Sequence, residues 1–243
     1  MENPPQLSYC TDITWKGRAD CQHCNIRHLM MFSGLPEQAF QDTLSPIDNI
    51  CFPGGAVLFE EGQCDKGVFS IRSGIIKLLS LTTDGKQRIV RLLGHGGVIG
   101  LELLEAGKCY RHTAVAFTPV DVCHIPLETM LQLDNSYPQL CQEIRTRLQD
   151  DLDRAEQWIV TLSSGTARKR IAWLLLLLVE YASSPEQSIE LPVREDMAAI
   201  IGTAVETASR IVAELKRNGI LRKAGIQHYR CDVAALEAIT RES

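Results

Sequence analysis

The sequence predicts an α+β protein in which a β-rich part is followed by a long helix and then by a set of short helices with a small β ribbon. Three observations support this fold class. Between residues 47 and 126, short apolar runs are separated by turn signals at intervals of about 8–12 residues. Residues 138–163 follow a helical period, and residues 164–243 alternate short helical and strand patterns.

Composition places the chain among globular proteins. Its 243 residues are 45% hydrophobic and 23% charged, which excludes a disordered chain and a coiled-coil rod. The longest purely apolar run, residues 171–179, is far shorter than the ~20 residues of a membrane span. The N-terminus has no signal-peptide pattern, so we expect a cytoplasmic protein. Nine cysteines in that compartment predict metal ligands or redox-active thiols rather than structural disulfides.

The β-rich part is expected over residues 34–137, after an N-terminal extension of residues 1–33. The extension holds Cys10, Cys21 and Cys24, and residues 34–46 have the pattern of a short amphipathic helix. The strands that follow are punctuated by pairs such as Asp84-Gly85, which favour tight hairpin turns. Regularly spaced short strands of this kind predict a sandwich or a β-roll.

A long helix is expected over residues 138–163. Its apolar residues are spaced by three or four positions along about six turns and form one narrow stripe. The stripe consists of Leu140, Ile144, Leu148, Leu152, Ala155, Ile159 and Leu162. Two interpretations fit it, a helix packed on its own β domain and a seam between two chains, and the narrowness favours a homodimer seam.

Residues 164–243 are expected to form a winged helix-turn-helix. A buried helix over residues 166–183 and a short strand over residues 189–193 precede two helices joined by a turn at Gly202-Thr203. Two strands, which form a ribbon, and a last helix follow. This part carries 11 Lys and Arg against 10 Asp and Glu, whereas residues 1–164 carry 14 against 20. The acidic excess therefore lies outside the segment expected to approach nucleic acid.

The second helix of this part has a polar and an apolar face. Glu206, Ser209 and Arg210 share one face, and Ala208, Ile211, Val212 and Leu215 share the other. Arg can bind guanine through two hydrogen bonds, Glu can accept from cytosine, and Ser can do either. An ordinary solvated helix face is the competing interpretation.

The chain resembles the CRP/FNR family of bacterial transcription factors. The segment 205–210 is similar to the FNR-type motif Glu-x-x-Ser-Arg, and the segments 69–74 and 122–129 are similar to the family's β-roll. The resemblance covers the chain from about residue 21 to its end. It implies a cyclic-nucleotide-binding-like roll acting as sensor domain, a dimerisation helix and a C-terminal DNA-binding domain.

The resemblance also implies the partners. Glu206, Ser209 and Arg210 would read a half-site of the TTGAT type in palindromic double-stranded DNA, and Val205, Thr207 and Thr203 complete the expected DNA-binding set. Val205 stands where the catabolite-activator branch has a base-reading Arg, which favours the FNR-like half-site. The turn at residues 82–86 would contact RNA polymerase in this family, although a plain hairpin explains it equally well.

The cysteine pattern points to an iron–sulfur cofactor. Cys21 and Cys24 form a C-x-x-C pair, which by itself serves zinc, thiol redox and iron–sulfur sites alike. In the FNR branch such a pair, a third N-terminal Cys and a β-roll Cys hold an oxygen-sensitive [4Fe–4S] cluster. Cys123 matches the roll ligand, but Met30 stands at the third N-terminal position. We therefore expect Cys10, Cys21, Cys24 and Cys123 to hold the cluster.

Other functions remain open at this stage. Cys109 is a substitute ligand, and a zinc site or a thiol switch would use the same C-x-x-C pair. Sensing of a small effector such as a cyclic nucleotide would use Glu102, Arg111 and Thr113, but the family's pattern is broken there. Haem sensing would need an axial ligand, and no His stands out. The enzyme motifs G-x-S-x-G, Walker A and H-E-x-x-H are absent from the sequence, so we do not expect an enzyme.

The expected mechanism couples the cluster to dimerisation. An intact cluster would favour the dimer, and its loss to O2 or NO would favour the monomer. Asp150, Asp151 and Asp153 lie beside the predicted seam, where like charges on the two chains would repel each other.

Overall fold

The structure is a computed structural model. It describes residues 10–21, 23–24, 32–36, 39, 47–81, 87–105, 107–182, 188–225 and 228–242. Most of the helix expected over residues 34–46 and the whole turn at 82–86 lie outside the described residues. The chain divides into two compact units, one of residues 1–80 and 92–150, the other of residues 81–91 and 151–243. Within the described part, no helix has both the length and the apolar character needed to cross a membrane.

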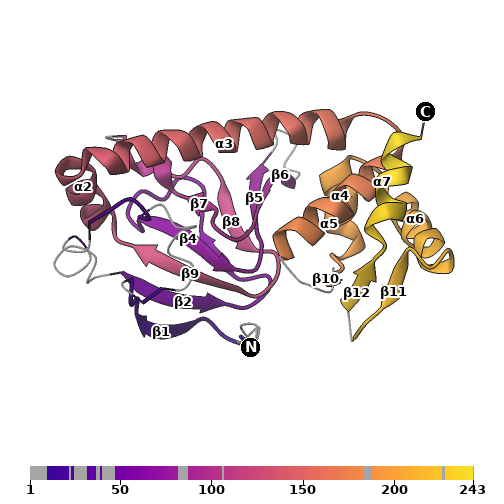
Figure 1. Cartoon of the computed structure of the whole chain (residues 1–243), viewed down its shortest axis with the longest axis horizontal. Coiled ribbons are helices and arrows are strands. Elements are labelled where there is room, and N and C mark those ends of the chain that lie inside the picture. Colours follow the sequence, from indigo (N-terminus) through magenta and orange to yellow (C-terminus); the bar gives the residue numbers. More distant parts are fainter. Residues whose placement is uncertain are drawn as a thin grey trace. The chain divides into compact units, whose positions relative to one another are not determined.

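Two antiparallel sheets form the β-roll and confirm the predicted α+β class (Figure 1). One sheet has the strand order β1-β2-β9-β4-β7 and the other has β3-β8-β5-β6. The strands of the first sheet are β1 (Thr14–Arg18), β2 (Asp48–Phe52), β9 (Val120–Ile125), β4 (Val68–Ser73) and β7 (Val98–Ile99). Those of the second are β3 (Val57–Phe59), β8 (Thr113–Ala116), β5 (Ile76–Leu81) and β6 (Gln87–Leu93).

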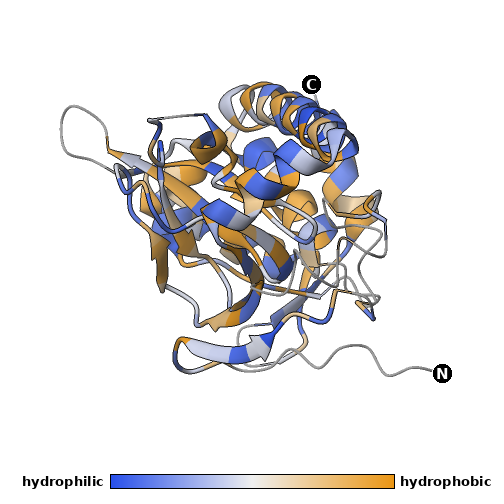
Figure 2. Cartoon of the chain, turned by 90° about the vertical axis from the view of Figure 1, so that its left-hand side faces the viewer, coloured by the Kyte–Doolittle hydropathy of each residue, from blue (hydrophilic) through white to orange (hydrophobic). Residues whose placement is uncertain are grey.

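Alternation along the strands gives the first sheet two different faces. One face carries Phe52, Phe69 and Val122 into a core shared with the second sheet, and hydrophobic residues colour much of the strand ribbons in Figure 2. The other face carries shorter and more polar side chains: Asn49, Cys51, Ser70, Arg72, Asp121 and Cys123. After β1, Ala19 and Cys21 pack against the core cluster on this second face, which is how Cys21 approaches the sheet.

Strand β1 differs from the expectation, because the sequence pattern predicted no strand in the extension. It pairs antiparallel with β2 at the edge of the sheet. Two side-chain contacts hold it: Trp15 Nε1 donates to Asp48 Oδ1 at 2.9 Å, and Lys16 Nζ pairs with Asp121 Oδ1 at 2.6 Å. Because most of the strand is exposed, it lacks the apolar alternation by which sequence patterns reveal strands.

Gly74 makes the turn between β4 and β5 possible. Its φ is 83°, and an added Cβ would lie 2.2 Å from the carbonyl oxygen of Pro119. A side chain at this position therefore meets both backbone strain and a backbone clash.

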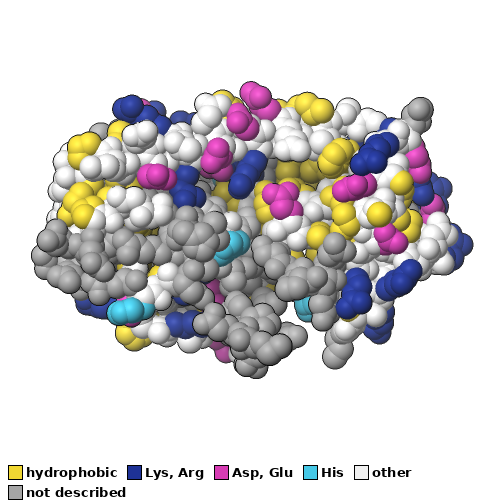
Figure 3. All heavy atoms as spheres, in the orientation of Figure 1, with side chains coloured by type: hydrophobic (Ala, Val, Ile, Leu, Met, Phe, Trp, Pro, Cys, Tyr) yellow, Lys and Arg dark blue, Asp and Glu magenta, His cyan; other side chains and the backbone are white. Residues whose placement is uncertain are grey.

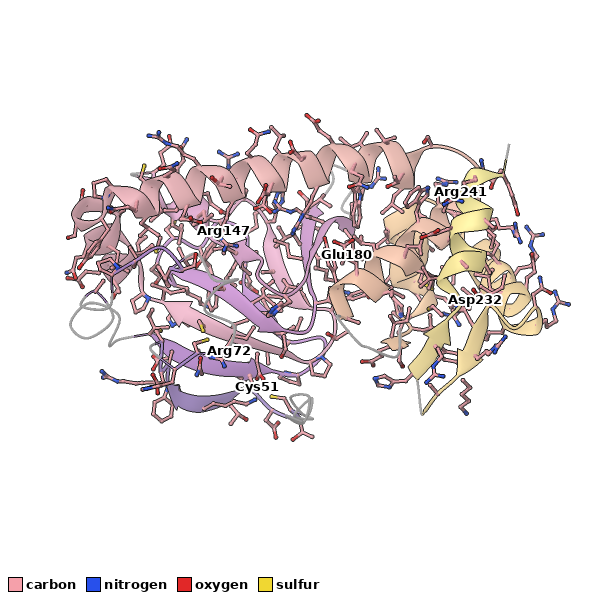
Figure 4. The ribbon with its side chains drawn as sticks, viewed as in Figure 1. Cys51, Arg72, Arg147, Glu180, Asp232 and Arg241 are labelled. Atoms are coloured by element: carbon pink, nitrogen blue, oxygen red, sulfur yellow. A yellow bond between two sulfur atoms is a disulfide. The ribbon has the colours of Figure 1, made fainter. Side chains whose placement is uncertain are left out.

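The long helix α3 (Pro138–Ser163) follows α2 (Leu127–Ser136). Leu140 and Ile144 pack into the roll's core beneath the helix, and Arg147 Nη1 donates to the carbonyl of Gly96 at 2.8 Å (Figure 4). Further along, Leu148 and Leu152 are 51% and 53% exposed. The first part of the stripe therefore packs on its own β domain, whereas the part that contains Leu148 and Leu152 is exposed in the single chain.

The second unit contains α4 (Ala167–Ala182), α5 (Arg194–Ile201), α6 (Val205–Arg217) and α7 (Val233–Arg241). Its sheet has the order β10-β12-β11, with β10 (Ser188–Glu190), β12 (His228–Cys231) and β11 (Leu221–Lys223). The predicted two-stranded ribbon is thus extended by β10, which overlaps the short strand predicted over residues 189–193 and pairs with β12. Arg168 on α4 bonds Glu214 on α6 at 3.1 Å and Glu242 after α7 at 2.6 Å, and so joins three segments of this unit.

Candidate functional site

Helix α6 has the two faces that the sequence predicts. Ala208, Ile211, Val212 and Leu215 are buried. Glu206 and Arg210 are exposed, and Ser209 is half-buried between them. Within the described residues, neither Glu206 nor Arg210 has a side-chain partner, so both side chains can reach a ligand without breaking an internal bond.

The start of α6 is set by a tight turn. Gly202 ends α5 in the left-handed conformation with φ of 63°, and the N–H of Thr203 donates to the carbonyl of Ala198 at 3.0 Å. Val205, Thr207 and Thr203 are half-buried around the first turn of α6. The first turn therefore presents Glu206 and its neighbours at the N-terminal end of the helix, where helix-turn-helix proteins contact base edges.

Basic side chains lie near this helix on the wing. Arg222 and Arg230 face each other across β11 and β12, and Lys223 is exposed beside them. Lys216 lies over the Tyr229 ring, 4.0 Å from its centroid, and its hydrogen bond lowers the pKa of the Tyr229 hydroxyl. Figure 3 shows Lys and Arg side chains gathered over the part of the surface where β11 and β12 lie. Such a surface suits contact with phosphates.

Two of the four predicted cluster ligands, Cys21 and Cys123, pack in the same core cluster on one face of the first sheet. Cys123 is 8% exposed, and Cys21 packs against the same core cluster. Burial raises the pKa of the Cys21 thiol to about 12, and the neighbouring Cys123 and Cys24 sulfurs add to this rise. Burial also raises the pKa of Cys123, while Arg72 opposes the rise.

Two side chains contact the Cys123 sulfur. Cys123 Sγ donates to Asn49 Oδ1 at 3.4 Å, and Arg72 Nη1 lies 3.9 Å from Cys123 Sγ. Arg72 Nη1 also donates to Asn49 Oδ1 at 3.2 Å. Figure 4 shows Arg72 over the strands of this sheet, with yellow sulfur atoms close to it in that view.

Cys10 lies on the same face of the sheet but beside Cys51. Burial raises the pKa of the Cys51 thiol to about 12, and hydrogen bonds with Cys10 and Asp121 add to the rise. Asp121 is the cross-strand partner of Cys51 and lies two residues before Cys123 on β9. Cys51 and Cys123 are thus diagonal neighbours, a relation that separates Cα atoms by about 7–8 Å.

The predicted ligands are cysteine thiols, which is the side-chain type that binds iron–sulfur clusters, and they lie on one face of the first sheet. Cys123 lies next to the Arg72 guanidinium, Cys21 and Cys24 are near enough to influence each other electrostatically, and Cys10 contacts Cys51 instead. The distances between their side chains do not fit a cluster. Within the described residues, no three His, Cys, Asp or Glu side chains lie close enough to one another to hold a metal ion. His23 is exposed and pairs with Asp20 instead.

A disulfide corrects one expectation from the sequence. Cys64 and Cys109 are bonded, with their Cα atoms 4.2 Å apart, although we expected two unpaired residues and treated Cys109 as a substitute ligand. Paired backbone groups bring them together, since Tyr110 N donates to Gln63 O and Gly62 N donates to Tyr110 O, both at 2.9 Å. Cys109 is therefore not available to a cluster.

The segment expected for a small effector is held by internal contacts. Glu102 lies on the 3-10 helix η2 (Leu101–Leu104) and accepts from the backbone N–H of Arg111 at 3.3 Å. Tyr110 is buried, stacks on Phe59 with ring centroids 3.6 Å apart, and bonds the carbonyl of Gly67 at 2.5 Å. Its ring thus fills part of the roll's interior.

Of the three acidic residues beside the predicted seam, Asp150 and Asp153 are exposed and Asp151 differs from the expectation. Asp151 pairs with Arg91, and its side chain is only 17% exposed. It is therefore not an exposed acid that repels a partner chain. The exposed large hydrophobic residues of α3 are Leu148, Leu152, Ile159 and Val160.

Comparisons with known proteins agree with this architecture. Residues 50–137 match the cyclic nucleotide-binding domain family, and residues 169–239 match the Crp-like helix-turn-helix domain family. The transcriptional activator protein FnrA of Stutzerimonas stutzeri is 29% identical over 228 residues, covering 90% of this chain and 91% of that protein. The fumarate and nitrate reduction regulatory protein of Escherichia coli is 28% identical over 214 residues, covering 84% of each chain.

Solved structures show the same fold. FixK2 from Bradyrhizobium japonicum superposes with a TM-score of 0.70 at 22% identity, covering 81% of this chain and 98% of that one. A CRP-family transcriptional regulator from Thermus thermophilus gives 0.67 at 23% identity, covering 79% and 97%. With both domain families matched in order and the relatives aligned over most of their length, this chain is a member of the CRP/FNR family, a DNA-binding transcription regulator and not an enzyme.

Proposed function

We propose that the chain is a homodimeric, oxygen- or redox-responsive regulator of the cytoplasm that binds a palindrome of TTGAT-type half-sites. The observation that carries the DNA half is helix α6, whose exposed face presents Glu206, Ser209 and Arg210 together. Arg210 donates to guanine, Glu206 accepts from cytosine, and Ser209 takes either role. Arg222, Lys223 and Arg230 of the wing provide positive charge for the flanking phosphates.

Dimerisation uses the exposed part of the α3 stripe. Leu148, Leu152 and Ile159 are all more than half exposed in the single chain. Burying such a stripe against its copy is favourable, and it places two copies of α6 for two half-sites one helical turn apart. The turn at residues 82–86, which lies outside the described residues, is the proposed contact with RNA polymerase.

The sensor is proposed to be a [4Fe–4S] cluster held by Cys10, Cys21, Cys24 and Cys123. A bound cluster supplies chemistry that responds to O2 or NO. The gathering of Cys21, Cys24 and Cys123 beside Arg72 supports this assignment. Cys10 must leave Cys51 to join them, and because Cys10 precedes β1, this movement would disturb the edge of the sheet.

DNA binding is tested by fluorescence anisotropy with a duplex carrying two TTGAT half-sites and with a scrambled duplex. The wild-type chain is expected to prefer the palindrome, and the preference is expected to shrink in Arg210→Ala. Arg88→Ala, which removes an exposed arginine of β6, is the matched control. Equal affinity of the wild type for both duplexes would contradict the assigned half-site.

Coupling of the sensor to dimerisation is tested by analytical ultracentrifugation of cluster-loaded and cluster-free protein at the same concentration. The cluster-loaded form is expected to contain more dimer. Identical dimer populations would reject this mechanism while leaving the assignment of α6 unaffected.

A further inference from the structure

The disulfide between Cys64 and Cys109 is open to solvent. Cys64 is exposed and Cys109 is half-buried, and the residues beside them in the sequence, Asp65 and Lys108, are exposed as well. The rate at which a disulfide exchanges with an external thiol depends on access to its sulfur atoms. A thiol from outside the chain can therefore reach this bond while the roll is folded.

The compartment in which a DNA-binding regulator works bears on the role of this bond. In the proposed function the chain acts in the cytoplasm, where thiol reductants keep most cysteines reduced. Disulfides that occur there are mostly transient, catalytic or redox-sensing. A bond that is broken and re-formed fits that compartment better than a permanent one does.

Each of the two cysteines follows a short hydrogen-bonded turn. In the turn before the first cysteine, Gln63 N donates to Glu60 O at 3.2 Å, and Glu60 N donates to Gln63 Oε1 at 3.0 Å. In the turn before the second, Lys108 N donates to Glu105 O at 3.1 Å, and the two side chains form an ion pair at 3.5 Å. The backbone that leads to each sulfur is thus held by local contacts.

Tyr110 joins the two turns through contacts that involve no cysteine side chain. Its N–H donates to Gln63 O and its carbonyl accepts from Gly62 N, both at 2.9 Å. Its ring stacks on Phe59, and its hydroxyl bonds the carbonyl of Gly67 at 2.5 Å. Two thiols released by reduction would therefore stay close to each other. The bond can then re-form as an intramolecular step, which orientation of this kind makes fast.

We propose that Cys64 and Cys109 form a reversible redox switch whose substrate is a protein dithiol of the thioredoxin type. A thiolate of the dithiol attacks the exposed Cys64 Sγ, and the electron pair of the broken S–S bond leaves on Cys109 Sγ, which takes up a proton. The second thiolate of the dithiol then attacks its own sulfur in the mixed disulfide and releases Cys64, which also takes up a proton.

Two electrons and two protons thus pass from the dithiol to the chain, and the dithiol becomes a disulfide. An oxidised partner reverses the exchange. The oxidised chain holds the two turns together covalently, and the reduced chain holds them by hydrogen bonds alone, so they open more often without unfolding of the sheets. The four proposed cluster ligands take no part, and only the argument from the compartment rests on the proposed function.

The first test follows reduction of the full-length chain by a thioredoxin-type protein, with free thiols counted by alkylation and mass spectrometry. The rate is expected to be proportional to the dithiol concentration and unaffected by urea below the unfolding transition, because the attack occurs in the folded state. Circular dichroism is expected to stay native after reduction, and oxidised glutathione is expected to restore the same pair. A rate that is independent of dithiol concentration or rises steeply with urea, or a loss of the native signal, would overturn the proposal.

A second test locates the attack. A thioredoxin-type protein whose second cysteine is replaced by Ser cannot complete the exchange, so it is expected to remain bonded to Cys64. Cys141→Ser, which removes a cysteine outside the disulfide, is the control and is expected to give the same adduct. An adduct on Cys109 in place of Cys64 would overturn the proposed direction of attack.

A third test measures how the two thiols are held together. Tyr110→Phe keeps the ring and removes its bond to the Gly67 carbonyl, so re-formation of the disulfide is expected to be about two- to tenfold slower, the range for one lost hydrogen bond. Tyr137→Phe, at the end of α2, is the matched control and is expected to behave as the wild type does. Equal rates in wild type and Tyr110→Phe would overturn the positioning by Tyr110.

Failure of this proposal is distinguishable from failure of the proposed sensor. Iron and sulfide near zero would reject the cluster and leave the exchange kinetics unchanged. A disulfide that is reduced only when the roll unfolds would reject the switch and leave the cluster and the DNA site unaffected.

Discussion

The disulfide between Cys64 and Cys109 gives the most quantitative prediction. It closes a loop of 45 residues that contains β4, β5, β6, β7 and η2. Loop-closure entropy for this length gives a stabilisation of about 4 kcal/mol at 25 °C, and measured disulfides typically contribute about 2–4 kcal/mol. Replacing both residues, as in Cys64→Ser with Cys109→Ser, should therefore lower the free energy of unfolding of the roll by an amount in this range.

Hydrogen exchange measures this loss locally, which matters because the two compact units need not unfold together. Peptides from β3 and β8, which pair with each other and flank the two cysteines in the sequence, should lose about thirtyfold to a thousandfold of their amide protection. Cys141→Ser, which removes an unbonded cysteine of α3, is the control and should leave exchange there unchanged. Equal protection in wild type and the double variant, or nine free thiols in the folded protein, would refute the reasoning.

The remaining predictions concern four single substitutions. Arg210→Ala should cost about 1–3 kcal/mol of binding to the palindrome, measured by anisotropy, and less on scrambled DNA, because a base contact is lost. Leu152→Asp should shift the sedimentation equilibrium towards monomer, because it places a charge in the exposed apolar stripe of α3; an unchanged dimer would place the seam elsewhere. Gly74→Ala should lower the melting temperature, since its Cβ would meet the Pro119 carbonyl at 2.2 Å. Burial raises the pKa of Cys231 from 9.0 to about 12. As the pH rises between these values, the thiol loses its proton in the unfolded state but keeps it in the folded state, so the free energy of unfolding should fall. Cys231→Ala should remove this fall, which urea unfolding measured at several pH values would show.

The helices were predictable because their patterns are long. In α3, apolar residues recur at three and four positions along the whole helix, and in α6 the buried residues Ala208, Ile211 and Leu215 alternate with polar ones at the same period. Each pattern repeats over several turns, so one exception does not obscure it. The strands of the roll were indicated by their turn residues, of which Gly74 is structurally required.

Several features could not be predicted because they depend on contacts between distant residues. Strand β1 is stabilised by Asp48 and Asp121, which lie far from it in sequence, and it has no apolar alternation of its own. The contact between Cys10 and Cys51 follows from the pairing of β1 with β2. The disulfide follows from the backbone pairing around Tyr110. In each case the sequence shows which residues are present but not which residue each one contacts.

Arg72 does have a signal in the sequence, although it is a weak one. Residues 69–74 are similar to the family's β-roll, and Arg72 is the one charged residue within them. A charged residue on the same face as a candidate ligand of the neighbouring strand is a pattern that strand alternation can reveal. Here the register of β4 with β9 shifts between Ile71 and Ser73, so only the structure shows that Arg72 lies beside Cys123.

The most direct test of the proposed sensor is the content of iron and acid-labile sulfide in chain purified without air. We predict about four of each per chain, as in a [4Fe–4S] cluster. We also expect a marked loss of both in Cys123→Ser and in Cys10→Ser, with Cys141→Ser unchanged. Iron and sulfide near zero in protein that still binds its palindrome would contradict the cluster and leave a thiol- or zinc-based regulator, or one that responds to a small effector.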